Sequence, residues 1–250
     1  MRKISKFCVA ACLVAVGAHA SAAGVIVVCG DEWSMSDAAF SQNGAFTNQY
    51  VLNVANLMMG GSGSVRMASG NGIAFGSQWN TVMNGNGYTV TSDTNPITLA
   101  GMVGYDAVYL AGGNGSANLA DIATYLNGGG NVYLAGGTGE FGTDTAEAAA
   151  WNPLLNLYGI NMGSAWINPP SAVDVTTDAG THPLRAGVDK LTFGFGHDMT
   201  AFGGSVVALS GGPELSANIG LVATNAVPEP ATMVALGVGL AAIVRRRRRS

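Results

Sequence analysis

The chain of 250 residues is 48% apolar and only 10% charged, with 37 glycines and a formal net charge of −4. Between residues 24 and 226 the basic residues are Arg66, Arg185 and Lys190, against 14 acidic residues, so this part carries a formal charge of −11. A surface this acidic repels nucleic acid and anionic lipid, which argues against both as partners. The length suits one α/β domain, and Cys29 as the single cysteine of this part excludes an internal disulfide.

Residues 1–23 have the three-part pattern of a secretory signal helix. Basic residues open the segment, an apolar run of about 11 residues extends from Phe7 to Gly17, and small residues fill positions 18–23. The run is too short to span a bilayer core of roughly 30 Å as a helix, so it indicates a cleaved signal peptide. We expect export by the Sec translocon and cleavage by signal peptidase between Ala20 and Ala23, which leaves residues 24–226 as the exported domain.

Apolar runs and helical spacing predict the elements of this domain. Val25–Cys29 is a continuous apolar run, typical of a strand buried on both faces of a sheet, and further strands are predicted at Tyr88–Thr91, Ala107–Ala111 and Asn131–Ala135. Helical spacing predicts helices at residues 50–58, 78–83, 119–126 and 143–157. Gly60-Gly61 ends the first helix, and Pro153 bends or restarts the last. Further strand-like stretches follow at residues 172–176, 191–195, 206–209 and 220–224.

Strands that alternate with helices predict an α/β fold, a doubly wound and mostly parallel sheet as in flavodoxin-like proteins. Glycine follows several of the strand ends, at the carboxyl edge where open α/β sheets bind ligands. The predicted ligand loops are Gly112 and Gly113 after one strand, and Gly136, Gly137 and Thr138 after the next.

The runs Tyr-Asp-Ala-Val-Tyr-Leu-Ala-Gly-Gly from Tyr105 and Gly-Gly-Asn-Val-Tyr-Leu-Ala-Gly-Gly-Thr-Gly from Gly129, with His182-Pro183-Leu184 and Gly187, resemble the class I glutamine amidotransferase-like fold. The resemblance implies a catalytic cysteine on the turn after a central strand, with a histidine and an acid from later segments. Here that turn, residues 136–140, has no cysteine, and without a nucleophile no amide can be attacked. We therefore predict no catalytic residues.

Two other nucleophiles remain as alternatives. Cys29 follows the first strand with His182 or His197 as a candidate base, but the nearby carboxylates of Asp31 and Glu32 should raise the pKa of its thiol. Thr138 could replace the cysteine, although the sequence pairs no base with it. A structural role for Cys29 is the better interpretation.

No cofactor or metal is predicted. Gly137-x-Gly139-x-x-Gly142 matches the dinucleotide fingerprint, but it follows the fourth predicted strand, and no acidic residue lies about 20 positions later. His197-Asp198 with Asp31 lacks the spacing of metal ligands. The tryptophans, which could stack on sugars, are scattered through the chain at Trp33, Trp79, Trp151 and Trp166.

Residues 227–250 form a distinct tail. Val227-Pro228-Glu229-Pro230 is followed by an apolar stretch, Ala231 to Val244, and by the arginines Arg245, Arg246, Arg247, Arg248 and Arg249. Fourteen helical residues would be about 21 Å long, a marginal transmembrane helix for a core of roughly 30 Å. The arginines are a stop-transfer signal that belongs in the cytoplasm, so the body lies outside.

The order of this tail, on a chain that also has a signal peptide, resembles the PEP-CTERM sorting signal of exosortase substrates. The resemblance implies that an exosortase recognises Pro228-Glu229-Pro230, removes the tail and passes the protein from the inner membrane to the envelope, the outer surface or the extracellular matrix. Our first hypothesis is a non-catalytic protein associated with extracellular polysaccharide. The alternatives are a hydrolase with a non-standard nucleophile and a carbohydrate-binding module.

Overall fold

Five parallel strands form the centre of the structure, a computed structural model that describes residues 24–69, 71–112, 117–169, 171–177, 182–201, 205–210 and 219–226. The parallel strands are β1 (Val25–Cys29), β2 (Gly63–Ser69), β3 (Tyr88–Asp93), β4 (Ala107–Ala111) and β5 (Asn131–Ala135). The predicted α/β fold with a parallel sheet is confirmed.

The sheet continues beyond β1 with four antiparallel strands. They are β11 (Ile219–Ala226), β10 (Ser205–Ser210), β7 (Val173–Thr177) and β8 (Lys190–Phe193). A separate two-stranded sheet pairs β6 (Ile160–Ile167) with β9 (Gly196–Ala201). In the described residues the sheet is therefore mixed, with five parallel strands among nine. After residue 160 the described residues contain no α-helix that could serve as the crossover that parallel pairing needs.

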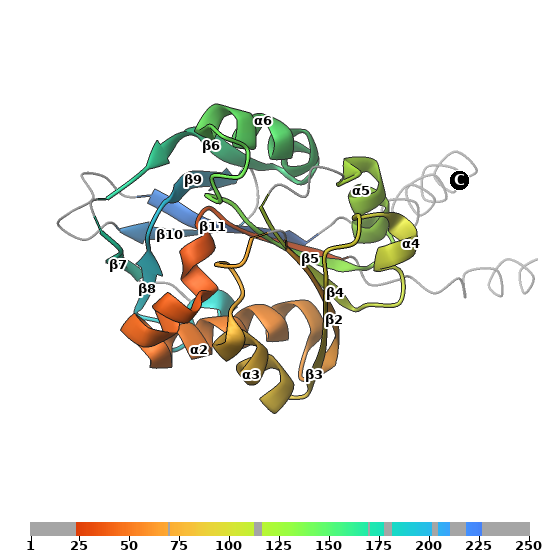
Figure 1. The fold of residues 1–250 in the computed structure, drawn as a ribbon, viewed down its shortest axis with the longest axis horizontal. Helices are drawn as coiled ribbons and strands as arrows, with labels where there is room; N and C mark the ends of the chain where they lie inside the picture. The colour runs from red at the N-terminus through yellow and green to blue at the C-terminus, as the bar shows by residue number, and fades with distance from the viewer. Residues whose placement is uncertain are drawn as a thin grey trace, which may run out of the picture. The chain divides into compact units, whose positions relative to one another are not determined.

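Helices cover both faces of the parallel half (Figure 1). Those on one face are α2 (Asp37–Met59) and α3 (Ser77–Gly85); those on the other are α4 (Leu99–Met102), α5 (Leu119–Asn127) and α6 (Asp144–Leu155). Short 3-10 turns lie at η2 (Glu32–Met35), η3 (Asn156–Tyr158) and η4 (Pro183–Arg185). Gly60 caps α2 with a φ of 73°, as predicted, and α6 continues past Pro153 to Leu155.

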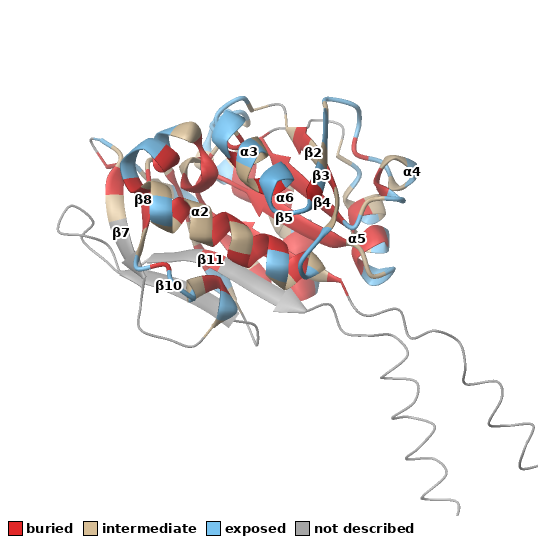
Figure 2. Ribbon diagram, turned by 90° about the horizontal axis from the view of Figure 1, so that it is seen from below, coloured by how far each residue is buried: buried red, intermediate tan, exposed pale blue. Residues whose placement is uncertain are grey.

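Alternation along each strand divides the core into two layers, shown by the buried strands and helix faces of Figure 2. Tyr109 and Tyr133 stack on each other on the side of α2 and α3, where Tyr109 also packs against Trp79. Their sequence neighbours Leu110 and Leu134 point the other way, toward α5 and α6. Each strand is thus buried on both faces, which is why the strands appear in the sequence as continuous apolar runs.

The parallel strands lie in the order β3-β2-β4-β5-β1. Counted from β2, this is the order 2-1-3-4-5 of a flavodoxin-like sheet, with β1 in the place of the last strand. The order along the chain therefore differs from that of a flavodoxin-like sheet, because β1 comes first in the sequence and lies at the end of the parallel strands.

Three strands, β2, β6 and β9, were not predicted. Strand β2 carries Arg66 in its middle, and this charge hides the apolar pattern. The side chain is nevertheless buried, because it forms a bidentate ion pair with Asp93 at 2.7 and 3.1 Å and donates to the carbonyl of Asn95. Burial of a charge requires such partners, and only β3 provides them.

The two ends of the domain meet in the sheet, since Val25 pairs with Ala226 across β1 and β11. No helix of the described residues is long and apolar enough to cross a membrane. The predicted signal helix at 1–23 and transmembrane helix at 231–244 lie outside those residues.

Candidate functional site

The predicted ligand loops lie at the carboxyl edge of the parallel strands. Gly112 and Gly137 have positive φ, +79° and +72°, which side chains rarely adopt. Gly136 donates its N–H to the carbonyl of Cys29 at 2.8 Å, which joins the ends of β5 and β1. Gly113, also predicted for this edge, lies outside the described residues.

Close approach of three backbone segments explains the glycines around Gly137. A Cβ atom on Gly137 would lie 2.5 Å from the carbonyl oxygen of Phe195 and 2.8 Å from that of Gly30. A Cβ atom on Gly30 would lie 2.1 Å from the carbonyl oxygen of His197, and one on Gly196 would lie 2.2 Å from the carbonyl oxygen of Gly30. The glycines therefore let the start of β9 pass over the ends of β1 and β5, and this contact places His197 beside the loop after β5.

A chain of hydrogen bonds links the loop after β5 to α6 and β9. The hydroxyl of Thr138 donates to Oε1 of Glu147 at 3.0 Å, and Oε2 of Glu147 lies 3.0 Å from Nε2 of His197. The side chains of Glu147 and His197 have no exposed area, whereas Thr138 is half-buried. No partner was predicted for Thr138; the structure corrects this, because the first turn of α6 folds Glu147 back over the loop.

The hydrogen-bond partners of His197 define its tautomer. Nδ1 lies 2.7 Å from the carbonyl oxygen of Gly163, which can only accept, so Nδ1 carries a hydrogen. Nε2 faces both Glu147 and the indole N–H of Trp166, each at 3.0 Å. The indole N–H can only donate, so Nε2 accepts from Trp166 in the tautomer that carries its hydrogen on Nδ1.

Trp166 covers this network from β6. Its ring packs against Phe195, with centroids 4.5 Å apart, and both rings are half-buried. Strand β6 is held beside α6 by Asn152, whose amide exchanges hydrogen bonds with the backbone of Met162 at 2.8 and 2.9 Å. The polar network is thus enclosed between α6, β6 and β9.

Asp31 and Glu32 follow β1 and have different environments. Asp31 accepts the N–H groups of Trp33 and Gly194 at 2.8 and 2.7 Å; burial nevertheless raises its pKa to about 8. Burial, with a smaller contribution from the nearby charges of Glu147 and Glu140, raises the pKa of Glu32 to about 7. Asp31 therefore joins two backbone segments, whereas Glu32 belongs to a group of carboxylates at the carboxyl edge.

Glu32 bonds the side chain of Asn71, which follows β2. Asn71 in turn accepts the N–H of Ile73 at 2.7 Å. Glu140, from the loop after β5, lies over Gly112, where a Cβ atom would come within 2.5 Å of its carboxyl carbon. Asn71, Glu140 and Glu147 were not predicted as site residues; the available signal was their position two to twelve residues after strands that end at the same edge.

Cys29 has the environment of a structural cysteine. Its side chain is fully buried, and its thiol donates to the carbonyl of Asp31 and the hydroxyl of Ser34, each at 3.3 Å. Burial first, and then the charge of Asp31, raises the pKa of this thiol to about 11. The predicted increase in its pKa is confirmed, although burial is the larger cause.

The other candidates lie apart or have structural roles. His182 caps η4, where its Nδ1 accepts from Leu184 at 3.2 Å. Trp79 and Trp151 are buried in the core, whereas Trp33 and Trp166 are half-buried and both contact the segment 194–197. Among the described residues, no three His, Cys, Asp or Glu side chains are grouped to hold a metal ion.

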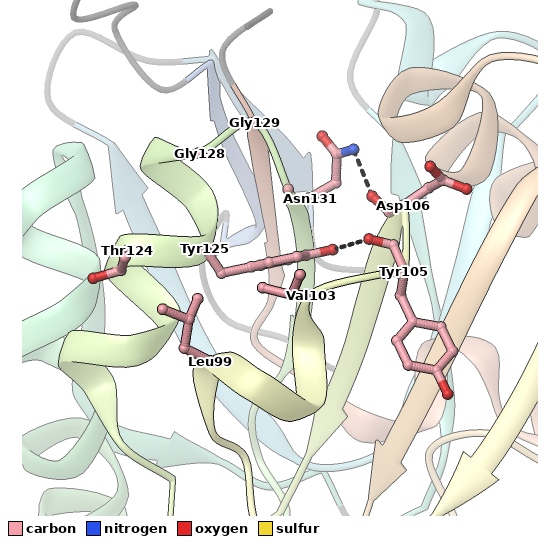
Figure 3. Close-up of a pocket in the computed structure, with 11 residues that line it drawn as sticks. Leu99, Val103, Tyr105, Asp106, Thr124, Tyr125, Gly128, Gly129 and Asn131 are labelled. Carbon is pink, nitrogen blue, oxygen red and sulfur yellow. Dashed lines mark hydrogen bonds between the residues drawn. The ribbon is translucent and has the colours of Figure 1, made fainter.

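A pocket of about 470 Å³ lies at the opposite, amino edge of the sheet (Figure 3). Tyr125 extends across it and donates to the carbonyl of Tyr105 at 2.8 Å, and Asn131 binds the carbonyl of Asp106. None of the predicted ligand loops contributes to this pocket.

The described residues thus define an α/β domain with a polar, partly enclosed candidate site at the carboxyl edge of its five parallel strands. Residues 226–249 match the PEP-CTERM protein-sorting motif, and this range contains Pro228-Glu229-Pro230 and the five arginines. The motif indicates an exosortase substrate, exported, processed at the membrane and sorted to the cell envelope or extracellular space. No curated protein and no solved structure matches the chain. Nothing therefore links the body to the amidotransferase-like fold in particular.

Proposed function

We propose that the protein is a non-catalytic component of the cell surface or extracellular matrix, whose body binds extracellular polysaccharide after export by the Sec pathway, signal cleavage and sorting by an exosortase. In this proposal residues 1–23 are the signal peptide, 24–226 the binding domain, and 227–250 the sorting signal, whose transmembrane helix anchors the precursor until the tail is removed. The matched sorting motif supports the route.

One observation carries the binding function: the carboxyl edge presents hydrogen-bonding groups, while its reactive groups are enclosed. Asn71, Thr138 and Glu140 are half-buried or exposed there. Cys29, Glu147 and His197 are fully buried. Sugars offer many hydroxyl groups to such an edge, and a buried thiol with a raised pKa offers them no nucleophile.

The test is binding of the mature protein to the polysaccharide isolated from the producing bacterium, measured by co-sedimentation. Thr138→Ala should weaken binding, because it removes a hydroxyl at the carboxyl edge. Thr124→Ala removes an exposed hydroxyl of α5 near the amino edge and is the matched control. Absence of binding by the unaltered protein would contradict the proposal, and equal weakening by both variants would contradict its location.

A hydrolase is the second candidate, favoured by the hydrogen bond of 3.0 Å between the hydroxyl of Thr138 and Glu147. A carboxylate in this position can accept the proton of a hydroxyl that attacks a substrate. Release of acyl groups or shorter chains from the same polysaccharide, lost in Thr138→Ala and kept in Thr124→Ala, would establish this function. Binding without turnover would leave the first proposal in place.

A further inference from the structure

The strand order places β2 and β4 side by side, although the helices that follow them lie on opposite faces of the sheet. The chain leaves β2 for α3, which packs on one face of the sheet, and leaves β4 for α5, which packs on the other. Strands β2 and β4 are neighbours, with Ser69 paired to Ala111 at their carboxyl ends. In open α/β sheets such a switch point is where ligands bind, outside the carboxyl ends of the two strands.

Four loops bring side chains to this point. Asn71 and Ile73 follow β2, Gly112 follows β4, Glu32 reaches across from β1, and Glu140 from β5. We call these five residues the switch-point site. Because Gly112 has no side chain, the carboxylate of Glu140 can lie over the end of β4.

The switch-point site combines hydrogen-bond acceptors with an apolar surface. Glu140 supplies an exposed carboxylate and Glu32 a buried one, and Ile73, two residues after Asn71, is 44% exposed, one of only three large exposed apolar side chains in the described part of the chain. Two of the three basic residues of the domain form ion pairs elsewhere, Arg66 with Asp93 and Lys190 with Asp174, and the third, Arg185, lies in η4. A ligand here must therefore supply donors and an apolar face, and must not be anionic.

We propose that the switch-point site binds a neutral, hydroxyl-rich sugar unit of a glycan. Its hydroxyl groups donate to Glu140, and the apolar face of its ring lies on Ile73. A uronate or other acidic sugar is repelled by the carboxylate of Glu140. This inference rests on the proposed polysaccharide-binding function and assigns it a ligand class and a location.

The test uses the mature protein, cellohexaose as a neutral probe and a hexagalacturonate as an acidic probe of equal length, with affinities from isothermal titration calorimetry. Ile73→Ser removes the apolar contact, and Val103→Ser is the matched control, because Val103 is also exposed (64%) but lines the pocket at the amino edge. Glu140→Gln removes a charge from an exposed side chain with little change in size. We expect binding of cellohexaose by the unaltered protein and Val103→Ser, and affinity about tenfold weaker in Ile73→Ser and in Glu140→Gln.

Each other outcome overturns the inference in a recognisable way. Unchanged affinity in Ile73→Ser and Glu140→Gln would place the glycan elsewhere and leave the proposed function intact. Preference for the hexagalacturonate, or binding that EDTA abolishes, would show that the ligand class is wrong. If cellohexaose and the polysaccharide of the producing bacterium both fail to bind, the proposed function fails together with the inference.

Discussion

Replacement of Gly137 by alanine tests the backbone packing that builds the candidate site. The residue has a φ of +72°, and a left-handed conformation costs a residue with a side chain about 1–2 kcal/mol. In addition, the new Cβ atom would lie 2.5 Å from a carbonyl oxygen and 2.7 Å from the Cα of Gly196. Overpacking of this kind costs about 1–3 kcal/mol. The expected loss in the free energy of unfolding is therefore about 2–5 kcal/mol.

Gly139 offers a matched control two residues away. Its φ is +68°, but nothing lies within 4 Å of a Cβ atom built on it, so Gly139→Ala has the conformational cost without the crowding. For a domain of about 200 residues, 1 kcal/mol lowers the melting temperature by about 2–4 °C. We expect the melting temperature to fall by roughly 2–8 °C in Gly139→Ala and by roughly 4–20 °C in Gly137→Ala. The fall should be larger still in Gly137→Val, because the side chain of valine is branched at Cβ.

Differential scanning calorimetry of the mature protein measures both variants. Equal losses would refute the close approach of the loop after β5 to β9, because crowding would then contribute nothing. Unchanged melting temperatures for both would refute the left-handed loop itself.

Three further results are expected. Cys29→Ser should leave the fold and any binding intact. The unaltered protein should react slowly with iodoacetamide, since burial raises the pKa of the thiol to about 11. Rapid labelling at neutral pH would contradict this expectation. The folded-state pKa values of Asp31 and Glu32 are raised to about 8 and 7, so the stability they contribute is complete below about pH 4 and is lost as pH rises through these values. The melting temperature should therefore fall between pH 5 and 9, less steeply in Glu32→Gln, and an increase over this range would be inconsistent with buried, uncompensated carboxylates. Glu229→Ala should leave export intact but block tail removal. Replacement of Arg245–Arg249 by serine should release an uncut product. Mass spectrometry of surface-released protein from the unaltered strain would contradict exosortase processing if it found an intact Ser250.

The sequence alone indicated the parts of this protein whose signals are local. Continuous apolar runs identified β1, β4 and β5, because a strand buried on both faces needs apolar side chains at every position. The sorting motif could be found in the same way, since an enzyme that recognises an extended segment beside a short apolar stretch depends on neighbouring residues. The direction of the shift in the pKa of the Cys29 thiol was also predictable from Asp31, although burial, its larger cause, was not.

Only the tertiary structure decided the composition of the site. Glu147 and His197 are 50 residues apart in the chain, and they meet because α6 and β9 pack over the same strand ends. Arg66 made β2 unrecognisable as a buried strand, although its partner Asp93 lies at the end of the neighbouring strand. Periodicity along a segment reports how one element is buried but not which element lies beside it. Strand order, and with it the switch point between β2 and β4, follows from packing free energy summed over the whole domain, which no local pattern of residues contains.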